Sequence, residues 1–183
     1  STTVITTDNE TAGITITQTG ITDSSGNLLT TEDGDSSTFT VVLDAKPTAN
    51  VTVSITGDDD TEYSLSDSSL TFSTSNWDTP QTVTVTGVDD TTIDGDITTT
   101  LTASASATGG FDGSEEASTT VITTDDDTAG ITITQTGTTD GSGNLLPTEA
   151  GDASTFTVVL DVQPTANVTV SLSGADSTEH SLS

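Results

Sequence analysis

The chain repeats itself with a period of 117 residues: residues 1–66 return, without a gap, as residues 118–183. Only 14 of the 66 aligned positions differ. A period of about one domain length indicates an array of whole domains rather than a solenoid of short units. We therefore expect a complete domain at 12–127, preceded by the last strand of one repeat at 1–11 and followed by the first strands of the next, incomplete repeat at 128–183.

Within one period, apolar residues alternate with Thr, which supplies 46 of the 183 residues. Thr favours strands, and this alternation is typical of strands that are buried on one face. The pattern predicts seven short strands, at 13–19, 38–43, 51–55, 70–72, 83–85, 97–105 and 118–124. Seven strands at this spacing predict an all-β fold: an immunoglobulin-like, seven-stranded antiparallel β-sandwich, repeated in tandem.

The charge of the chain is strongly one-sided, with 29 Asp and Glu residues against a single Lys and a formal net charge of −28. Nucleic acid is excluded as a direct partner because phosphate binding needs a basic surface. An anionic membrane surface is excluded as a partner for the same reason. The sequence also contains no apolar stretch of about 18 residues that would predict insertion into a membrane. The charge favours cations as partners, or solubility in a salty medium.

The acidic residues gather in loops that follow the first, third, fifth and seventh predicted strands, at 32–35, 58–62, 89–96 and 125–127. In an up-down sandwich these four loops lie at the same end, so their carboxylates are expected to converge. Two such charges about 4 Å apart repel by roughly 4 kcal/mol at an effective dielectric constant of 20. A metal is the expected counterion, and oxygen ligands without His or Cys favour Ca²⁺ over Mg²⁺, which requires a stricter octahedron. The alternative is that the loops are a solvated acidic surface.

Several segments resemble the Calx-beta domain: Thr31-Glu32-Asp33-Gly34 before the strand at 39–43, the short strand at 70–72, the loop at 88–96 and the closing run at 125–127. Two further segments, at 47–53 and 76–87, resemble the tandem extender domains of giant bacterial surface adhesins of the RTX and biofilm type. The resemblance covers the whole repeat. It implies a calcium-binding β-sandwich in an extracellular, cell-surface protein.

The resemblance also implies that Ca²⁺ is held by Glu32 and by the loops after the third, fifth and seventh strands. The second copy of the repeat reduces the number of candidate ligands in the loop after the third strand. Asp59 and Glu62 remain acidic in that copy, whereas Asp58 and Asp60 do not. In the fifth-strand loop, Asp94 stands where the family usually has Glu. The predicted ligands are Glu32, Asp59, Glu62, Asp89, Asp90, Asp94, Asp125, Asp126 and Asp127.

An enzymatic function is not expected. The only His, His180, corresponds to Tyr63 in the first copy, and the chain has no Cys, so neither a Ser-His-Asp nor a Cys-His arrangement can form. Catalytic carboxylate pairs need a cleft in which burial raises one pKa, and acidic loop tips are not expected to supply one.

Three functions are compatible with the sequence. The first is a calcium-stabilised structural extender of a large extracellular adhesin, which projects distal modules in adhesion or biofilm formation and has neighbouring repeats as its partners. The second is a subunit of a self-assembling extracellular filament or surface layer, in which neighbouring strands complete the sandwich. The third is a carbohydrate-binding module, a hypothesis that depends on Trp77 alone.

Overall fold

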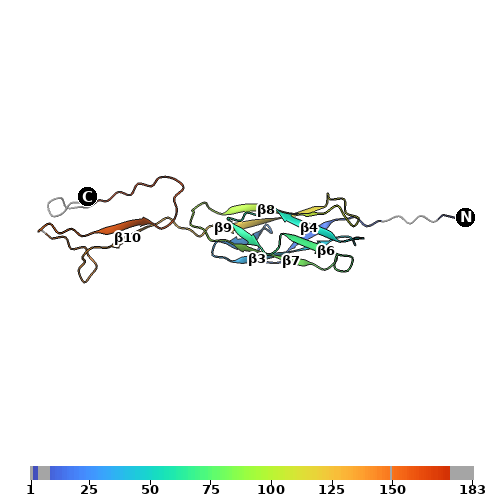
Figure 1. Cartoon of the computed structure of the whole chain (residues 1–183), viewed down its shortest axis with the longest axis horizontal. Coiled ribbons are helices and arrows are strands. Elements are labelled where there is room, and N and C mark those ends of the chain that lie inside the picture. Colours follow the sequence, from blue (N-terminus) through green and yellow to red (C-terminus); the bar gives the residue numbers. More distant parts are fainter. Residues whose placement is uncertain (1, 4–8, 149, 174–183) are drawn as a thin grey trace. The chain divides into compact units, whose positions relative to one another are not determined.

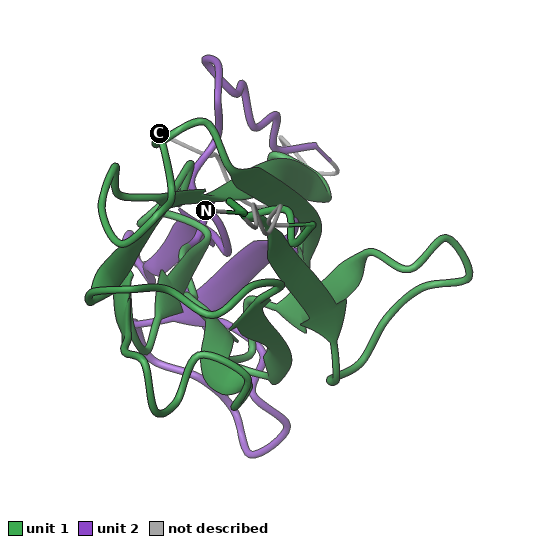
Figure 2. Ribbon diagram, turned by 90° about the vertical axis from the view of Figure 1, so that its right-hand side faces the viewer, with its two compact units in different colours: residues 1–90, 94–126 green, residues 91–93, 127–183 purple. Residues whose placement is uncertain are grey.

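The computed structural model of the chain describes residues 2–3, 9–148 and 150–173 (Figure 1). It divides into two compact units, which Figure 2 distinguishes by colour. Unit 1 comprises residues 1–90 and 94–126, and unit 2 comprises residues 91–93 and 127–183. The part of the chain that the structure describes contains no helix with the length and apolar character that crossing a membrane requires.

Unit 1 is a sandwich of a four-stranded sheet, in the order β1-β3-β7-β5, and a five-stranded sheet, in the order β2-β9-β8-β4-β6. The strands are β1 Ile14–Gln18, β2 Leu28–Thr31, β3 Ser36–Leu43, β4 Val51–Thr56, β5 Tyr63–Leu65, β6 Ser69–Phe72, β7 Gln81–Gly87, β8 Ile97–Ala105 and β9 Glu116–Thr124. All neighbouring strands pair antiparallel except β2 and β9, which are parallel. The predicted all-β, immunoglobulin-like sandwich is confirmed.

The core of unit 1 follows from the alternation in the sequence. In β3 and β4 every second residue is buried, and the intervening Thr and Ser side chains face outward. The fully buried side chains include Phe39, Phe72 and Leu101, while Trp77 is half-buried and packs against the same core. Because each fully buried aliphatic or aromatic side chain contributes about 1.5–3 kcal/mol, this single core is the main source of stability in a unit without disulfides.

All seven predicted strands are present, and the structure adds two short ones, β2 and β5. Each is too short to show a clear alternation, and each lies at the edge of its sheet. The first acidic cluster therefore follows β2 and not the first predicted strand directly. This difference matters for the acidic loops, because β2 and β5 are the two strands that adjoin Glu32 and Glu62 in the chain.

Unit 2 contains a two-stranded antiparallel sheet formed by β10 (Ile131–Gln135) and β11 (Phe156–Leu160). Its apolar side chains are far more exposed than those of unit 1, with Ile131, Ile133 and Val159 each at least half exposed. Unit 2 therefore has, in its described residues, the start of a sandwich without its closed core.

Candidate metal site

The parallel pairing of β2 with β9 places Glu32 beside the end of β9. The register runs from Leu28 opposite Val121 to Thr31 opposite Thr124. The Glu32 backbone N–H continues the ladder by donating to the Thr124 carbonyl, at 3.2 Å. The two strands run in the same direction. The residues that follow them, Glu32 and Asp125, therefore lie at the same end of the sheet.

The pairing of β5 with β7 places Glu62 beside the loop that follows β7. Tyr63 lies opposite Gly87, and the Val88 backbone N–H donates to the Glu62 carbonyl at 2.9 Å. Asp59 closes the turn before Glu62, since its carboxylate accepts hydrogen bonds from the backbone N–H and the hydroxyl of Thr61, at 3.2 and 2.6 Å. Glu62 therefore lies next to the chain segment that carries Asp89 and Asp90.

Gly87 lets the ends of the two sheets approach each other. A Cβ atom at this position would overlap the carbonyl oxygen of Thr31, the residue before Glu32. The Gly87 backbone N–H also donates to the Asp35 carbonyl at 3.1 Å. Any residue larger than Gly would push the end of β7 away from the end of β2, so Gly87 is required for the two acidic loops to meet.

The loop at 88–96 is tied to the end of β9 through Gly95. The Gly95 backbone N–H donates to Asp125 Oδ2 at 2.8 Å. Gly95 has φ of +78°, in the left-handed region that favours glycine. This turn directs the loop back toward Asp125 and places Asp94 next to Glu62, whose pKa it raises.

Glu32 and Glu62 are buried to an unusual degree for carboxylates, with only 2% and 4% of their surfaces exposed. Among the described residues, Glu32 Oε2 and Glu62 Oε2 have no hydrogen-bond partner. Burying a polar group without such a partner is costly, and burying a charge is more so. Two neighbouring acids in this state make this end of the sandwich a candidate site for a positively charged group.

The electrostatics of Glu32 agree with this interpretation. The pKa of Glu32 is raised to about 7, first by burial and then by the nearby carboxylates of Asp125, Asp90 and Glu62, against a hydrogen bond from the Asp126 backbone that lowers it. The pKa of Glu62 is also raised, first by burial and then by the nearby carboxylates of Asp94, Asp59, Asp90 and Asp125. Each buried acid thus lies in the negative field of several others.

The geometry fits a hard divalent cation. Glu32 and Asp90 offer carboxylate oxygens within 4.8 Å of each other. Two oxygens bound to one Ca²⁺ at roughly 2.3–2.6 Å can lie at most about 5 Å apart, so one ion can contact both. The chain contains one Lys and no Arg, and no His in its first 179 residues, so basic side chains are nearly absent as an alternative source of positive charge.

The structure brings together most of the predicted ligands of unit 1. Glu32, Glu62, Asp90 and Asp125 surround the buried oxygens, and Asp59 and Asp94 lie beside Glu62. Asp126 contributes its backbone, and Asp89 is exposed. Asp127 is the first residue of the second segment of unit 2, and the assignment of metal ligands remains a prediction at every position. Sequence reasoning missed the contribution of Gly87, although an isolated Gly at the end of a strand pattern can signal a close backbone approach.

No protein-family model matches the sequence, and no curated protein matches it. Similar solved structures include SSP-19, an MSP-domain protein like family member in Caenorhabditis elegans, at 12% identity and a TM-score of 0.41 over 54% of this chain and 94% of that chain. The apo form of the Calx CBD1 domain matches at 16% identity and a TM-score of 0.38 over 63% of this chain and 99% of that chain. The YadV chaperone matches at 11% identity and a TM-score of 0.42 over 68% of this chain and 61% of that chain. At these values, none of the three carries an argument about the site or the function.

Proposed function

We propose that unit 1 binds Ca²⁺ through Glu32, Glu62, Asp90 and Asp125, and that the chain is a calcium-stabilised structural extender of a large extracellular adhesin at the cell surface. The observation that carries the metal site is the pair of buried carboxylates, Glu32 and Glu62, each with an oxygen that lacks a hydrogen-bond partner. The resemblance of the acidic loops to Calx-beta motifs supports the same ion.

The donor set favours Ca²⁺ over Mg²⁺. All of the candidate side-chain donors are carboxylate oxygens, which suit both ions. They come from four separate loops whose positions are fixed by strand pairing, and Ca²⁺ accepts six to eight oxygens in irregular geometry. Mg²⁺ requires a near-ideal octahedron at a shorter distance and retains its waters. A bound Ca²⁺ would offset the repulsion among the loops and link β2, β5, β7 and β9 at one end of the sandwich.

The extender role follows from the tandem sequence together with this site. The closing run Asp125-Asp126-Asp127 is followed by only three residues, 128–130, before β10 begins. A metal held by that run would fasten the exit of unit 1 to the body of its own sandwich, and so short a linker leaves little freedom for a hinge. Repeats joined in this way form a stiff spacer for distal binding modules, and no catalytic step is part of the proposal.

Thermal unfolding of the full chain tests the metal site. Ca²⁺ should raise the melting temperature of the transition reported by Trp77, the only Trp, while Mg²⁺ at the same concentration should raise it much less. A ligand present at a hundredfold excess over its Kd contributes about 2.7 kcal/mol to the free energy of unfolding. The same melting temperature in Ca²⁺ and in EGTA would contradict the metal site and would mean that the acidic loops are a solvated surface.

A second candidate function is that of a subunit of a self-assembling extracellular filament or surface layer. In such an assembly, strands from neighbouring molecules complete the sandwich. Sedimentation velocity of the full chain across a range of concentrations separates the two functions. An extender remains monomeric, whereas an assembling subunit forms larger species as its concentration rises.

A further inference from the structure

The chain enters unit 1 at one end of the sandwich and leaves it at the other. Gly87, the last residue of β7, lies against Thr31, the last residue of β2. β3 begins opposite the end of β7 and ends opposite Ile14, where β1 begins. The first strand therefore starts at the end of the sandwich that is remote from the candidate metal site. The last strand, β9, leads into Asp125 at the site itself.

A pull on the two ends of unit 1 consequently acts along its strands. It draws β9 toward the metal site, and it draws β1 and the segment that follows it, 19–27, in the opposite direction. This segment leads directly into β2, which pairs in parallel with β9. Because the two strands are parallel, the opposing forces enter their pair at opposite ends, at Leu28 and at Thr124. The four register pairs are then loaded in shear and must yield together.

β2 is held in the sandwich more firmly than β1. Three of the five residues of β1 are exposed. In β2, by contrast, Leu28 and Thr30 are almost completely buried, and so is Glu32 directly after it. Removing β2 from the sandwich would expose the apolar surface of Leu28 to water, which is unfavourable. We therefore expect β1 to detach first and the pair of β2 with β9 to supply the main resistance to the pull.

Further hydrogen bonds join β2 to β9. The Thr30 hydroxyl donates to Thr123 Oγ1 at 3.4 Å in the interior, and the Glu32 backbone N–H donates to the Thr124 carbonyl at 3.2 Å. Each of these bonds connects the two segments that a pull would separate. Glu32 and Asp125, which follow the two strands, are also candidate ligands of the proposed Ca²⁺ site, so a bound ion would connect the same two segments.

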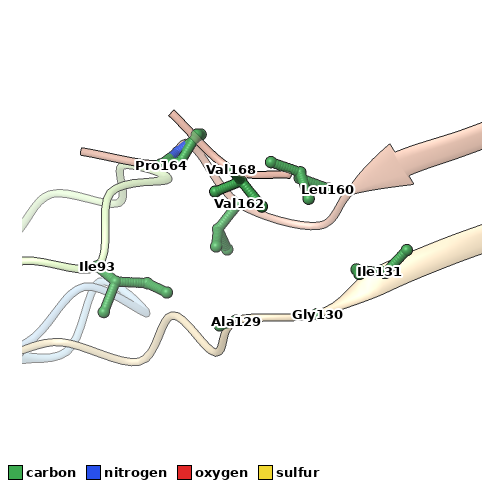
Figure 3. Close-up of a pocket in the computed structure, with 8 residues that line it drawn as sticks. All are labelled: Ile93, Ala129, Gly130, Ile131, Leu160, Val162, Pro164 and Val168. Atoms are coloured by element: carbon green, nitrogen blue, oxygen red, sulfur yellow. The ribbon is translucent and has the colours of Figure 1, made fainter. Parts of the chain in front are cut away.

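We propose that the parallel pair of β2 with β9 is the load-bearing element of the repeat, the part that resists unfolding when the chain is pulled from its two ends. Its hydrogen bonds are individually weak, but in shear they share the load. The load-bearing role rests on the proposed extender function, whereas the direction of loading rests on the strand geometry alone. The apolar pocket in Figure 3 is lined by residues of unit 2, among them Leu160 and Val168, and takes no part in the proposal.

The opposite edge of the same sheet supplies a control. β6, like β2, is a four-residue edge strand, and it pairs antiparallel with β4. Its residue Leu70 is buried, as Leu28 is in β2. β6 lies in the middle of the chain of unit 1, between β5 and β7. A pull on the ends of unit 1 therefore reaches β6 only after the strands that carry the load have separated.

Single-molecule force spectroscopy of the full chain in EGTA tests the direction of loading. The chain contains no Cys, so pairs of introduced Cys residues at exposed positions can serve as attachment points. Attachment at Ser24→Cys and Thr128→Cys pulls from before the start of β2 and from beyond the end of β9, which loads the pair in shear. Attachment at Asp33→Cys and Thr128→Cys pulls the same pair from one end, which separates its residues one after another. The second geometry should separate the strands at about half the force or less, because the barrier to forced separation is lower.

Two variants pulled end to end, from Thr11→Cys and Thr128→Cys, test which strand carries the load. Leu28→Ala and Leu70→Ala should both lower the equilibrium stability in urea, because each removes buried apolar atoms. Only Leu28→Ala should lower the unfolding force, by about a third or more. Equal forces in the two pulling geometries, or equal losses of force from the two variants, overturn the proposal. If Leu28→Ala does not fold, the two geometries still decide, because they keep the native β2 and β9.

Repeating the end-to-end measurement in Ca²⁺ separates this proposal from the metal site. An ion that connects Glu32 with Asp125 should raise the unfolding force above its value in EGTA. An unchanged force in Ca²⁺ would contradict the metal site, while the difference between the two pulling geometries in EGTA would still support the load-bearing pair. A rise in Ca²⁺ together with equal forces in the two geometries would support the metal site and overturn the load-bearing pair.

Discussion

Two nearly identical hairpins in this molecule have different environments. The pair β1–β3 and the pair β10–β11 share their register and their Thr–Asp hydrogen bond. Yet Ile14 is buried whereas Ile131 is half exposed. Local sequence is thus sufficient to set the pairing of the first strands. Burial of their apolar faces depends on strands that lie about 40 or more residues further along the repeat.

The same contrast extends to β2. In unit 1, Leu28–Thr31 forms a strand because β9 lies beside it. The matching segment of unit 2 keeps the isolated bridge between Thr139 and Leu145, which corresponds to the bridge between Thr22 and Leu28, but it forms no strand. Glu32 lies directly after β2, so its burial depends on β9. The copies of the buried acids, Glu149 and Glu179, lie outside the described residues.

The largest expected effect comes from truncating the same aromatic residue in each copy. Phe39→Ala should lower the free energy of unfolding of unit 1 by about 3–5 kcal/mol, because Phe39 is completely buried. Phe156→Ala, at the matching position of half-buried β11, should cost unit 1 less than about 0.5 kcal/mol. Urea unfolding followed by Trp77 fluorescence reports on unit 1 alone. Equal losses from the two substitutions would mean that the two units share one core.

A second pair of variants tests the close approach that builds the site. Gly87→Ala should destabilise unit 1 by about 2–4 kcal/mol and weaken Ca²⁺ binding, because its Cβ would overlap the Thr31 carbonyl. Gly141→Ala is the control, since a Cβ there would contact nothing within 4 Å, and it should change stability by less than about 0.5 kcal/mol. Urea unfolding with and without Ca²⁺ gives both quantities. A Gly87→Ala variant with unchanged stability would show that the ends of β2 and β7 need not meet.

A smaller effect is expected from pH. The folded-state pKa of Glu32 is raised from 4.5 to about 7, so between these values the folded chain binds more protons than the unfolded chain. For the metal-free chain, this contribution to stability is fully present below about pH 4.5 and is lost as the pH rises through about 7. Unfolding in EGTA at a series of pH values should therefore show a decline in the free energy of unfolding across that window.

Glu32→Gln is the control for this pH dependence, because its amide does not titrate, and the decline in its stability should be shallower. In the presence of Ca²⁺ the direction reverses for the native chain: stabilisation by the ion should increase with pH across the same window, because the proton and the metal compete for the carboxylate. Identical pH profiles for Glu32→Gln and the native chain would contradict the assignment of this titration to Glu32.

The strands that could be predicted from the sequence are those whose own residues determine them. Alternation alone indicates 97–105, where Leu101, Ala103 and Ala105 recur at every second position. β2 and β5 were not predicted because each forms by pairing with a strand distant in sequence. β2 pairs with β9, and β5 pairs with β7. The acidic loops could also be predicted as a group. The burial of Glu32 and Glu62 could not, because it depends on the approach of two sheets at Gly87 and not on any local pattern.

The most direct test of the central claim is a calorimetric titration of Ca²⁺ into the metal-free full chain and into two variants. Glu32→Gln removes a buried candidate ligand, and Asp112→Asn removes an exposed carboxylate that accepts hydrogen bonds from its own turn at Ser114. We predict saturable binding to the native chain, a loss of at least about tenfold in affinity for Glu32→Gln, and little change for Asp112→Asn. Equal affinities for all three proteins would mean that the ions screen a diffuse acidic surface, and would contradict a site built around Glu32.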